Sequence, residues 1–121
     1  MFDHIGLRVK NLDASVKFYT AALKPLGFVL SSHDASSAGF GPPGAPATLW
    51  LYPTDGAAGP GAHVGFHAAD HAAVTRFHRA ALEAGGRDHG APGIRADYSP
   101  TYFAAFIIDP DGNNVEAVCL K

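Results

Sequence analysis

The sequence has few of the residues that would mark several large classes of protein. It contains one cysteine, Cys119, so an internal disulfide framework is excluded and a reducing, cytoplasmic location is expected. It has no apolar run long enough to span a membrane and no signal-peptide pattern, so we expect no membrane partner. The formal net charge of -2 gives no general attraction to nucleic acid, and no nucleic-acid partner is expected.

Glutamate is also scarce, whereas histidine is not. The 121 residues include two glutamates, Glu83 and Glu116, but seven histidines. A hydrophobic share of 47% with 17% charged residues is typical of a globular domain rather than of a disordered chain. Because glutamates are so few, the place of each one in the predicted elements carries information about function.

An internal repeat divides the chain. Shifting the sequence by 59 residues, from His4 to His63, places HIGLRV on HVGFHA and also aligns Gly27 with Gly86. The same shift places the AAL at 21–23 on the AAL that follows Arg79. We therefore predict one domain over residues 1–121, made of two homologous modules at about 1–55 and 60–121.

Each module begins with a strand of alternating polar and apolar residues and continues with a helix. Asn11 or Asp13 can cap the first helix, and Asp70 can cap the second. Further strands are expected at 28–33, 39–43 and 47–53, near Arg87, at 101–108 and at 114–120, with a loop at 91–102 and a turn at 109–114. The order is βαβββ twice. It predicts an α+β fold in which mostly antiparallel strands form an incomplete barrel with the helices outside.

The two repeated histidines and one glutamate are the candidate site. His4 and His63 lie opposite the apolar residues of their strands, and Glu116 interrupts an apolar strand, where a buried carboxylate is costly unless it is paired or bound to a metal. Two imidazoles and one carboxylate form a facial triad that leaves positions open for substrate. The alternatives are hydrogen-bonded core histidines and an ion pair of Glu116 with Arg8 or Arg95.

Four segments resemble the vicinal oxygen chelate superfamily, the group of glyoxalase I, the bleomycin-resistance proteins and the type I extradiol dioxygenases. They are DHIGLRV, KFYTAALKPLGF, HVGFHA and YFAAFIIDPDGNNVEAV, and the resemblance extends over essentially the whole chain. It implies paired βαβββ modules and a divalent metal ion (Zn, Ni, Mn or Fe) held by His4, His63 and Glu116. It also implies a small-molecule substrate with vicinal oxygens, and a homodimer whose active sites are lined by modules of one or both chains.

The resemblance has departures at two positions. Glyoxalase I and the related epimerases usually carry a fourth ligand, Glu or Gln, on the last strand of the first module. Pairing TLWLYP with NVEAVC puts Trp50 opposite Glu116 at this place. Tryptophan cannot bind the metal, so a four-ligand site is incomplete. Fosfomycin-resistance thiol transferases normally have a threonine two residues after the first histidine, whereas this chain has Gly6.

Other polar and aromatic residues are candidates for a pocket around the metal. Glu116 and His67, which shares the face of His63, are the candidate catalytic residues, with His67 as a general base or as a residue that orients a ligand. The alternative for His67 is a solvated residue at the end of its strand. For each of the substrate-binding candidates that follow, the alternative is a core, paired or surface role. The candidate substrate-binding residues are Arg8, Trp50, Tyr52, Arg95, Tyr98 and Tyr102.

Three functions follow from this pattern. The leading hypothesis is a divalent-metal-dependent, glyoxalase-like enzyme with lyase, isomerase or dioxygenase chemistry. The second is a non-catalytic protein of the bleomycin-resistance type, which binds or sequesters a small molecule; Trp50 in place of a ligand favours it. The third is a dimer with a relict site.

Overall fold

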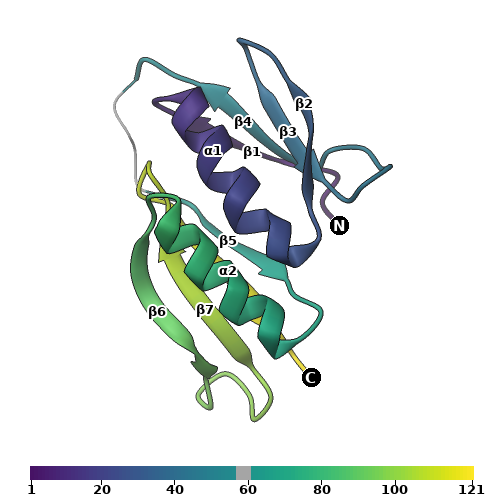
Figure 1. Ribbon diagram of the computed structural model, residues 1–121, viewed down its shortest axis with the longest axis vertical. Coiled ribbons are helices and arrows are strands. Elements are labelled where there is room, and N and C mark those ends of the chain that lie inside the picture. Colours follow the sequence, from purple (N-terminus) through teal and green to yellow (C-terminus); the bar gives the residue numbers. More distant parts are fainter. Residues whose placement is uncertain (57–60) are drawn as a thin grey trace.

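Two modules with the same order of elements follow one another in the computed structural model, which describes residues 1–56 and 61–121 (Figure 1). The first contains β1 (Ile5–Val9), α1 (Leu12–Leu23), a short 3-10 helix η1 (Lys24–Leu26), β2 (Val29–His33), β3 (Ala38–Gly41) and β4 (Leu49–Pro53). The second contains β5 (His63–His67), α2 (His71–Glu83), β6 (Arg87–Ile94), β7 (Phe103–Ile108) and β8 (Asn114–Cys119). This is the predicted βαβββ order, repeated.

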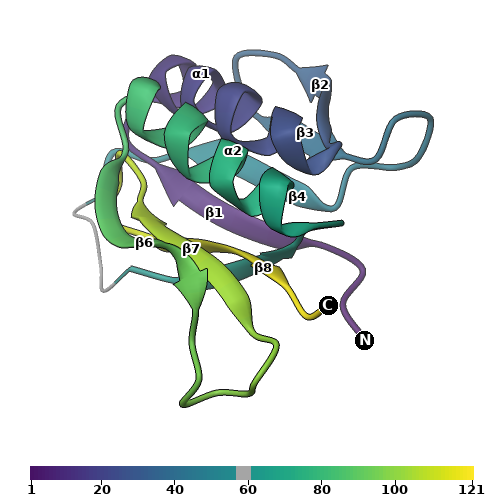
Figure 2. The ribbon, with the colours of Figure 1, turned by 60° about the horizontal axis from the view of Figure 1, so that its bottom comes forward.

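Each module forms one four-stranded sheet. The strand orders are β1-β4-β3-β2 and β5-β8-β7-β6, and in each sheet the first pair is parallel and the other two are antiparallel. The two helices lie side by side and cover the same side of the two sheets (Figures 1 and 2). The predicted α+β fold class is confirmed, with two open sheets. The opposite faces, which no described helix covers, are called the uncovered faces below.

The helix starts agree with the capping residues in the sequence. The Asn11 side chain accepts a hydrogen bond from the Ala14 amide at 3.0 Å, and the Asp70 side chain accepts one from the Ala73 amide at 2.7 Å. Asn11 rather than Asp13 is therefore the first cap. The segment 91–102 was expected to be a loop throughout, and this is partly wrong, because β6 extends to Ile94 by pairing with β7.

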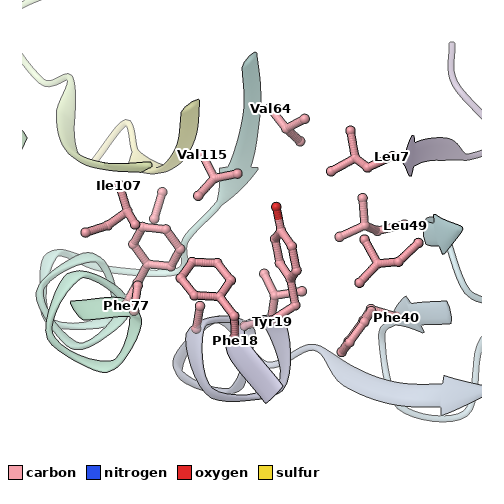
Figure 3. Packing of buried hydrophobic residues seen from close by; sticks show 14 of the residues in the cluster. Leu7, Phe18, Tyr19, Phe40, Leu49, Val64, Phe77, Ile107 and Val115 are labelled. Carbon is pink, nitrogen blue, oxygen red and sulfur yellow. The ribbon is translucent and has the colours of Figure 1, made fainter. Parts of the chain in front are cut away.

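The hydrophobic core lies between the helices and the sheets. Phe18 and Tyr19 of α1 pack edge to face with ring centroids 4.9 Å apart, and Phe77 of α2 lies close to Phe18 (Figure 3). Alternate strand residues such as Leu7 and Val115 complete the core from the sheets. Their neighbours along each strand therefore point to the uncovered faces. In the described ranges, no helix is long and apolar enough to cross a membrane.

Gly86, which follows α2, occupies a place that has no room for a side chain. A Cβ atom there would lie 2.6 Å from Ile107 Cγ2 and 2.7 Å from Phe18 Cε1. We expect Gly86→Ala to lower the free energy of unfolding by about 1–3 kcal/mol through overpacking, measured by urea denaturation. Gly65→Ala is the matched control, because its Cβ would approach nothing closer than 3.8 Å. Equal stability of the two variants would contradict the prediction.

Candidate metal site

The strand register makes Trp50 the counterpart of Glu116. In the first sheet Gly6 pairs with Trp50, and in the second sheet Gly65 pairs with Glu116. Both side chains belong to the central strand next to the first strand of their module. The predicted equivalence of these positions is confirmed, so the first module carries an indole where the second carries a carboxylate.

Glu116 is buried and has two polar partners. It is 3% exposed, its Oε1 lies 3.0 Å from His63 Nε2, and its Oε2 accepts a hydrogen bond from the Tyr102 hydroxyl. The expected alternative, an ion pair with Arg8 or Arg95, is wrong within the described residues, because neither guanidinium contacts Glu116. The carboxylate is therefore held by a phenol on one oxygen and faces an imidazole with the other.

The contact that His63 Nδ1 makes determines whether Nε2 is a hydrogen-bond donor or an acceptor. His63 Nδ1 lies 3.0 Å from the carbonyl oxygen of Asn114, which can only accept, so Nδ1 carries a proton. A neutral imidazole then presents the Nε2 lone pair to Glu116 Oε1, which is also an acceptor. Two facing acceptors need a proton or a cation between them. Donation of the outer nitrogen to a backbone carbonyl is also the usual arrangement of a metal-binding histidine.

Asn114 adds a third possible metal-binding atom, an amide oxygen, to the same place. The open hollow beside His63 and Glu116 has a volume of about 480 Å³ and is also lined by Tyr98, Tyr102, Phe106 and Asn114. The Asn114 side-chain oxygen is buried and has no hydrogen-bond partner in the described structure. An imidazole nitrogen, a carboxylate oxygen and an amide oxygen suit a divalent transition-metal ion, so these donors fit one.

His4 does not join this group within one chain. It precedes β1, its Nδ1 lies 2.7 Å from Asp3 Oδ1, and both side chains are exposed. It lines a different hollow, of about 160 Å³, where β1 approaches Val64 and Phe66 of β5. Among residues 1–56 and 61–121, no three histidine, cysteine or acidic side chains gather closely enough to hold a metal. The structure therefore brings together two of the three expected ligands.

Two of the loop candidates, Tyr98 and Tyr102, line the same hollow as Glu116. Tyr98 and Tyr102 pack edge to face with ring centroids 5.0 Å apart, and burial together with the neighbouring carboxylate raises the pKa of Tyr102 to about 12. Arg95 lies over the ring of Phe106, 5.3 Å from its centroid, and donates a hydrogen bond to the Ala91 carbonyl. Tyr102 therefore contacts a candidate ligand directly, whereas Arg95 supports the wall.

The remaining candidates lie on the uncovered faces. His67 ends β5 and is exposed, and Arg8 is an exposed residue of β1 that pairs in register with Tyr52. Trp50 is half-buried beside Tyr52. Asn114 and Phe106 are residues of the hollow that the sequence analysis missed. Alternation along β8 was the available signal for Asn114, because it stands two positions before Glu116 and so shares its face.

Comparison with known proteins identifies the family. Residues 1–117 match the model of the Glyoxalase/Bleomycin resistance protein/Dioxygenase superfamily. The chain belongs to this superfamily. Superfamily members commonly use divalent metal ions, bind small molecules and form dimers. A search of curated proteins gives no significant match.

Solved structures of the superfamily share the fold. The chain is 29% identical to a glyoxalase/bleomycin resistance protein from Albidiferax ferrireducens T118, with a TM-score of 0.82 and with 98% of this chain and 97% of that chain covered. A glyoxalase-related enzyme from Fulvimarina pelagi is 16% identical, with a TM-score of 0.75 and coverage of 98% and 86%. A superfamily enzyme from Burkholderia phytofirmans PsJN is 14% identical, with a TM-score of 0.75 and coverage of 98% for each chain.

Proposed function

We propose that the protein is a divalent-metal-dependent, glyoxalase-like enzyme of the cytoplasm that acts on a small substrate with vicinal oxygens. The observation that carries the proposal is the contact of His63 Nε2 with Glu116 Oε1, because the opposite nitrogen of His63 is already committed to a carbonyl. The buried amide oxygen of Asn114 beside them supports it. Zn, Ni, Mn and Fe all suit this donor set.

The third ligand in this proposal is His4 of a second copy of the chain. His4 is exposed and stands apart from His63 and Glu116 of its own chain. A two-fold symmetric dimer uses the same surface patches twice, so it can place His4 of each copy at the Glu116 of the other. The proposed state is therefore a homodimer with two sites, each built from both chains.

The reaction we propose is isomerisation, lyase chemistry or oxygen insertion. When bound, the metal ion polarises the vicinal oxygens of the substrate and stabilises the negative charge that develops on them. Glu116 and His67 are the proposed groups that hold or move a proton, and Tyr102 keeps Glu116 oriented through Oε2. Arg8, Trp50, Tyr52, Arg95, Tyr98 and Tyr102 are the proposed substrate-binding residues.

Mixing two inactive variants tests the ligand set. His4→Ala and Glu116→Ala are each expected to bind no metal as homodimers. In a mixed dimer, one site lacks both His4 and Glu116, whereas the other site has both of them. Randomly paired dimers are expected to bind about a quarter of the wild-type metal, because about half are mixed and each has one intact site of two.

Bound metal is measured by elemental mass spectrometry after co-refolding with each of the four ions and removal of the free ion. Wild-type protein that binds none of them would overturn the metal proposal. A metal-binding wild type with no recovery in the mixture would instead overturn the assignment of His4 to a second copy. Tight binding of small molecules without turnover or metal would support a sequestration protein of the bleomycin-resistance type.

A further inference from the structure

Two aromatic side chains pack against glycines on the uncovered face of the first sheet. A Cβ atom on Gly39 of β3 would lie 2.9 Å from Cη2 and Cζ3 of Trp50, and one on Gly6 of β1 would lie 3.0 Å from Cε2 of Tyr52. Each ring therefore occupies the space that a side chain on the neighbouring strand would fill. We call Trp50 and Tyr52 together the aromatic shelf.

The shelf presents two rings with nearly the same orientation. The ring centroids are 6.5 Å apart and the ring planes differ by 15°. The register explains this arrangement, because Trp50 is paired with Gly6 on one side and with Gly39 on the other. Trp50 extends over β3 and Tyr52 over β1, so the two rings spread out from β4 in opposite directions. The two rings therefore present nearly parallel planes on this side of the sheet.

The two rings are not buried in the protein core. Tyr52 is 37% exposed and Trp50 is half-buried, while the alternate residues Leu49 and Leu51 of the same strand are buried under α1. No described helix covers this side of the sheet (Figure 2). Partly exposed aromatic rings with nearly parallel planes can stack with another π-system.

A positive charge stands beside the shelf. Arg8 of β1 is the register partner of Tyr52, so the two side chains leave the same face of the sheet. Arg8 is exposed and makes no ion pair in the part of the chain that the structure describes. A guanidinium binds a carboxylate through paired hydrogen bonds and can also lie against aromatic rings.

We propose that the shelf and Arg8 bind an aromatic or conjugated carboxylate, with the ring on Trp50 and Tyr52 and the carboxylate on Arg8. The inference rests on the proposed function in one respect, namely that this ligand is the substrate of the enzyme. It narrows the substrate class from any small molecule with vicinal oxygens to a planar, unsaturated acid. The binding itself depends only on first-module residues and not on the metal ligands of the second module.

Trp50 is the only tryptophan of the chain, so its fluorescence reports directly on the shelf. The experiment titrates the metal-free, full-length protein with 2-naphthoate in the presence of a chelator. The comparison probes are 2-naphthalenemethanol, which has the ring without the charge, and decalin-2-carboxylate, which has the charge without a flat ring. We expect 2-naphthoate to change the Trp50 emission at concentrations at least about tenfold lower than either comparison probe.

Four variants divide the binding energy, with equilibrium dialysis as a second measurement. Tyr52→Leu is expected to weaken 2-naphthoate binding about 3- to 10-fold, and Tyr52→Phe is expected to retain it. Arg8→Gln is expected to weaken binding about tenfold or more. Arg79→Gln is the control, because Arg79 is an exposed arginine in α2 of the second module, where it pairs with Glu83. Thermal unfolding of each variant checks that it is folded.

The possible results separate this inference from the metal proposal. Equal binding of the three probes, or unchanged binding by Arg8→Gln, would overturn the inference. A Trp50 emission that depends on protein concentration but not on 2-naphthoate would also overturn it, since a second copy would then cover the shelf. The titration uses metal-free protein with a chelator, so its result does not depend on whether the protein binds metal. Likewise, the metal measurement does not depend on whether the protein binds 2-naphthoate.

Discussion

Replacement of Glu116 by glutamine is expected to abolish metal binding and metal-dependent activity while the protein remains folded. Glutamine keeps the size of the side chain and one carbonyl oxygen, but it removes the negative charge that strengthens the binding of a divalent ion. Loss of a residue that merely supports a ligand costs about 10- to 100-fold in metal affinity, and we expect loss of this carboxylate to exceed that range. Elemental analysis and a metal titration with a competing chelator measure the effect.

The folded state of this variant follows from the surroundings of Glu116. Breaking a buried ion pair usually costs about 3–5 kcal/mol because it leaves a buried charge alone. Here the histidine partner is not buried, since the His63 side chain is 51% exposed, so water can solvate its imidazole when the carboxylate is replaced. Removing the charge of Glu116 also removes the cost of keeping a carboxylate at 3% exposure. We therefore expect the free energy of unfolding to change by less than about 1 kcal/mol.

Glu83→Gln is the matched control, because Glu83 is the other glutamate of the chain and is an exposed residue of α2 that pairs with Arg79. It should leave both metal affinity and stability unchanged. One result for Glu116→Gln would contradict its role as a metal ligand. Unchanged metal affinity with a stability loss of several kcal/mol would make Glu116 a structural partner of His63 and Tyr102.

The fold was predictable from local patterns because the chain repeats them. Alternating apolar residues such as Leu7 and Val9 fix which face of a strand is buried, and the repeat carries the same choice to Val64. The same logic correctly placed Trp50 and Glu116 at equivalent positions. Strand β6 was foreseen only at its start, since Gly90 and Gly93 within it are typical of turns and only pairing with β7 makes them strand residues.

The partners of Glu116 were less predictable, because they depend on segments that no periodicity describes. Tyr102 reaches Glu116 from a loop, and the contact depends on the path of that loop between β6 and β7. His4 stands one residue before β1, where strand alternation no longer fixes the direction of a side chain. Sequence patterns therefore located the His63–Glu116 pair, but not the contact with Tyr102 or the position of the third proposed ligand.

Replacement of Asp109 by alanine is the substitution with the largest expected effect on stability. Asp109 is 4% exposed and accepts hydrogen bonds from the Tyr19 hydroxyl at 2.5 Å and from the Asn113 side-chain amide at 2.9 Å. It also accepts from the backbone amides of Asp111 and Asn113. One carboxylate thereby shapes the turn before β8 and joins it to α1 of the other module.

The neighbouring carboxylate extends the same connection. Asp111 accepts hydrogen bonds from the Lys10 backbone amide at 2.8 Å and from the Ser15 hydroxyl at 3.1 Å, both at the start of α1. An acidic group at a helix start is also favoured by the helix dipole. The turn at 109–114 therefore has a structural role in holding the two modules together, which accounts for Asp109, Asp111 and Asn113.

Asp109→Ala leaves the Tyr19 hydroxyl and the Asn113 amide buried without partners, and each such group costs about 1–3 kcal/mol. We expect the free energy of unfolding to fall by about 3 kcal/mol or more, measured by urea denaturation. Asp55→Ala is the control, because Asp55 is exposed. A loss no larger than that of the control would show that the Asp109 hydrogen bonds do not stabilise the contact between the modules.

Tyr19 makes the free energy of unfolding depend on pH in the alkaline range, which urea denaturation at several pH values measures. Burial, followed by the charge of Asp109, raises the pKa of Tyr19 well above its ordinary value of 10.0. Above pH 10 the unfolded chain loses the phenol proton while the folded chain keeps it, so stability present at lower pH declines as pH rises. Tyr19→Phe should make this decline shallower without removing it, because Tyr102, with its pKa of about 12, contributes in the same direction. An equally steep alkaline decline in Tyr19→Phe would mean that the Tyr19–Asp109 hydrogen bond does not couple proton binding to folding.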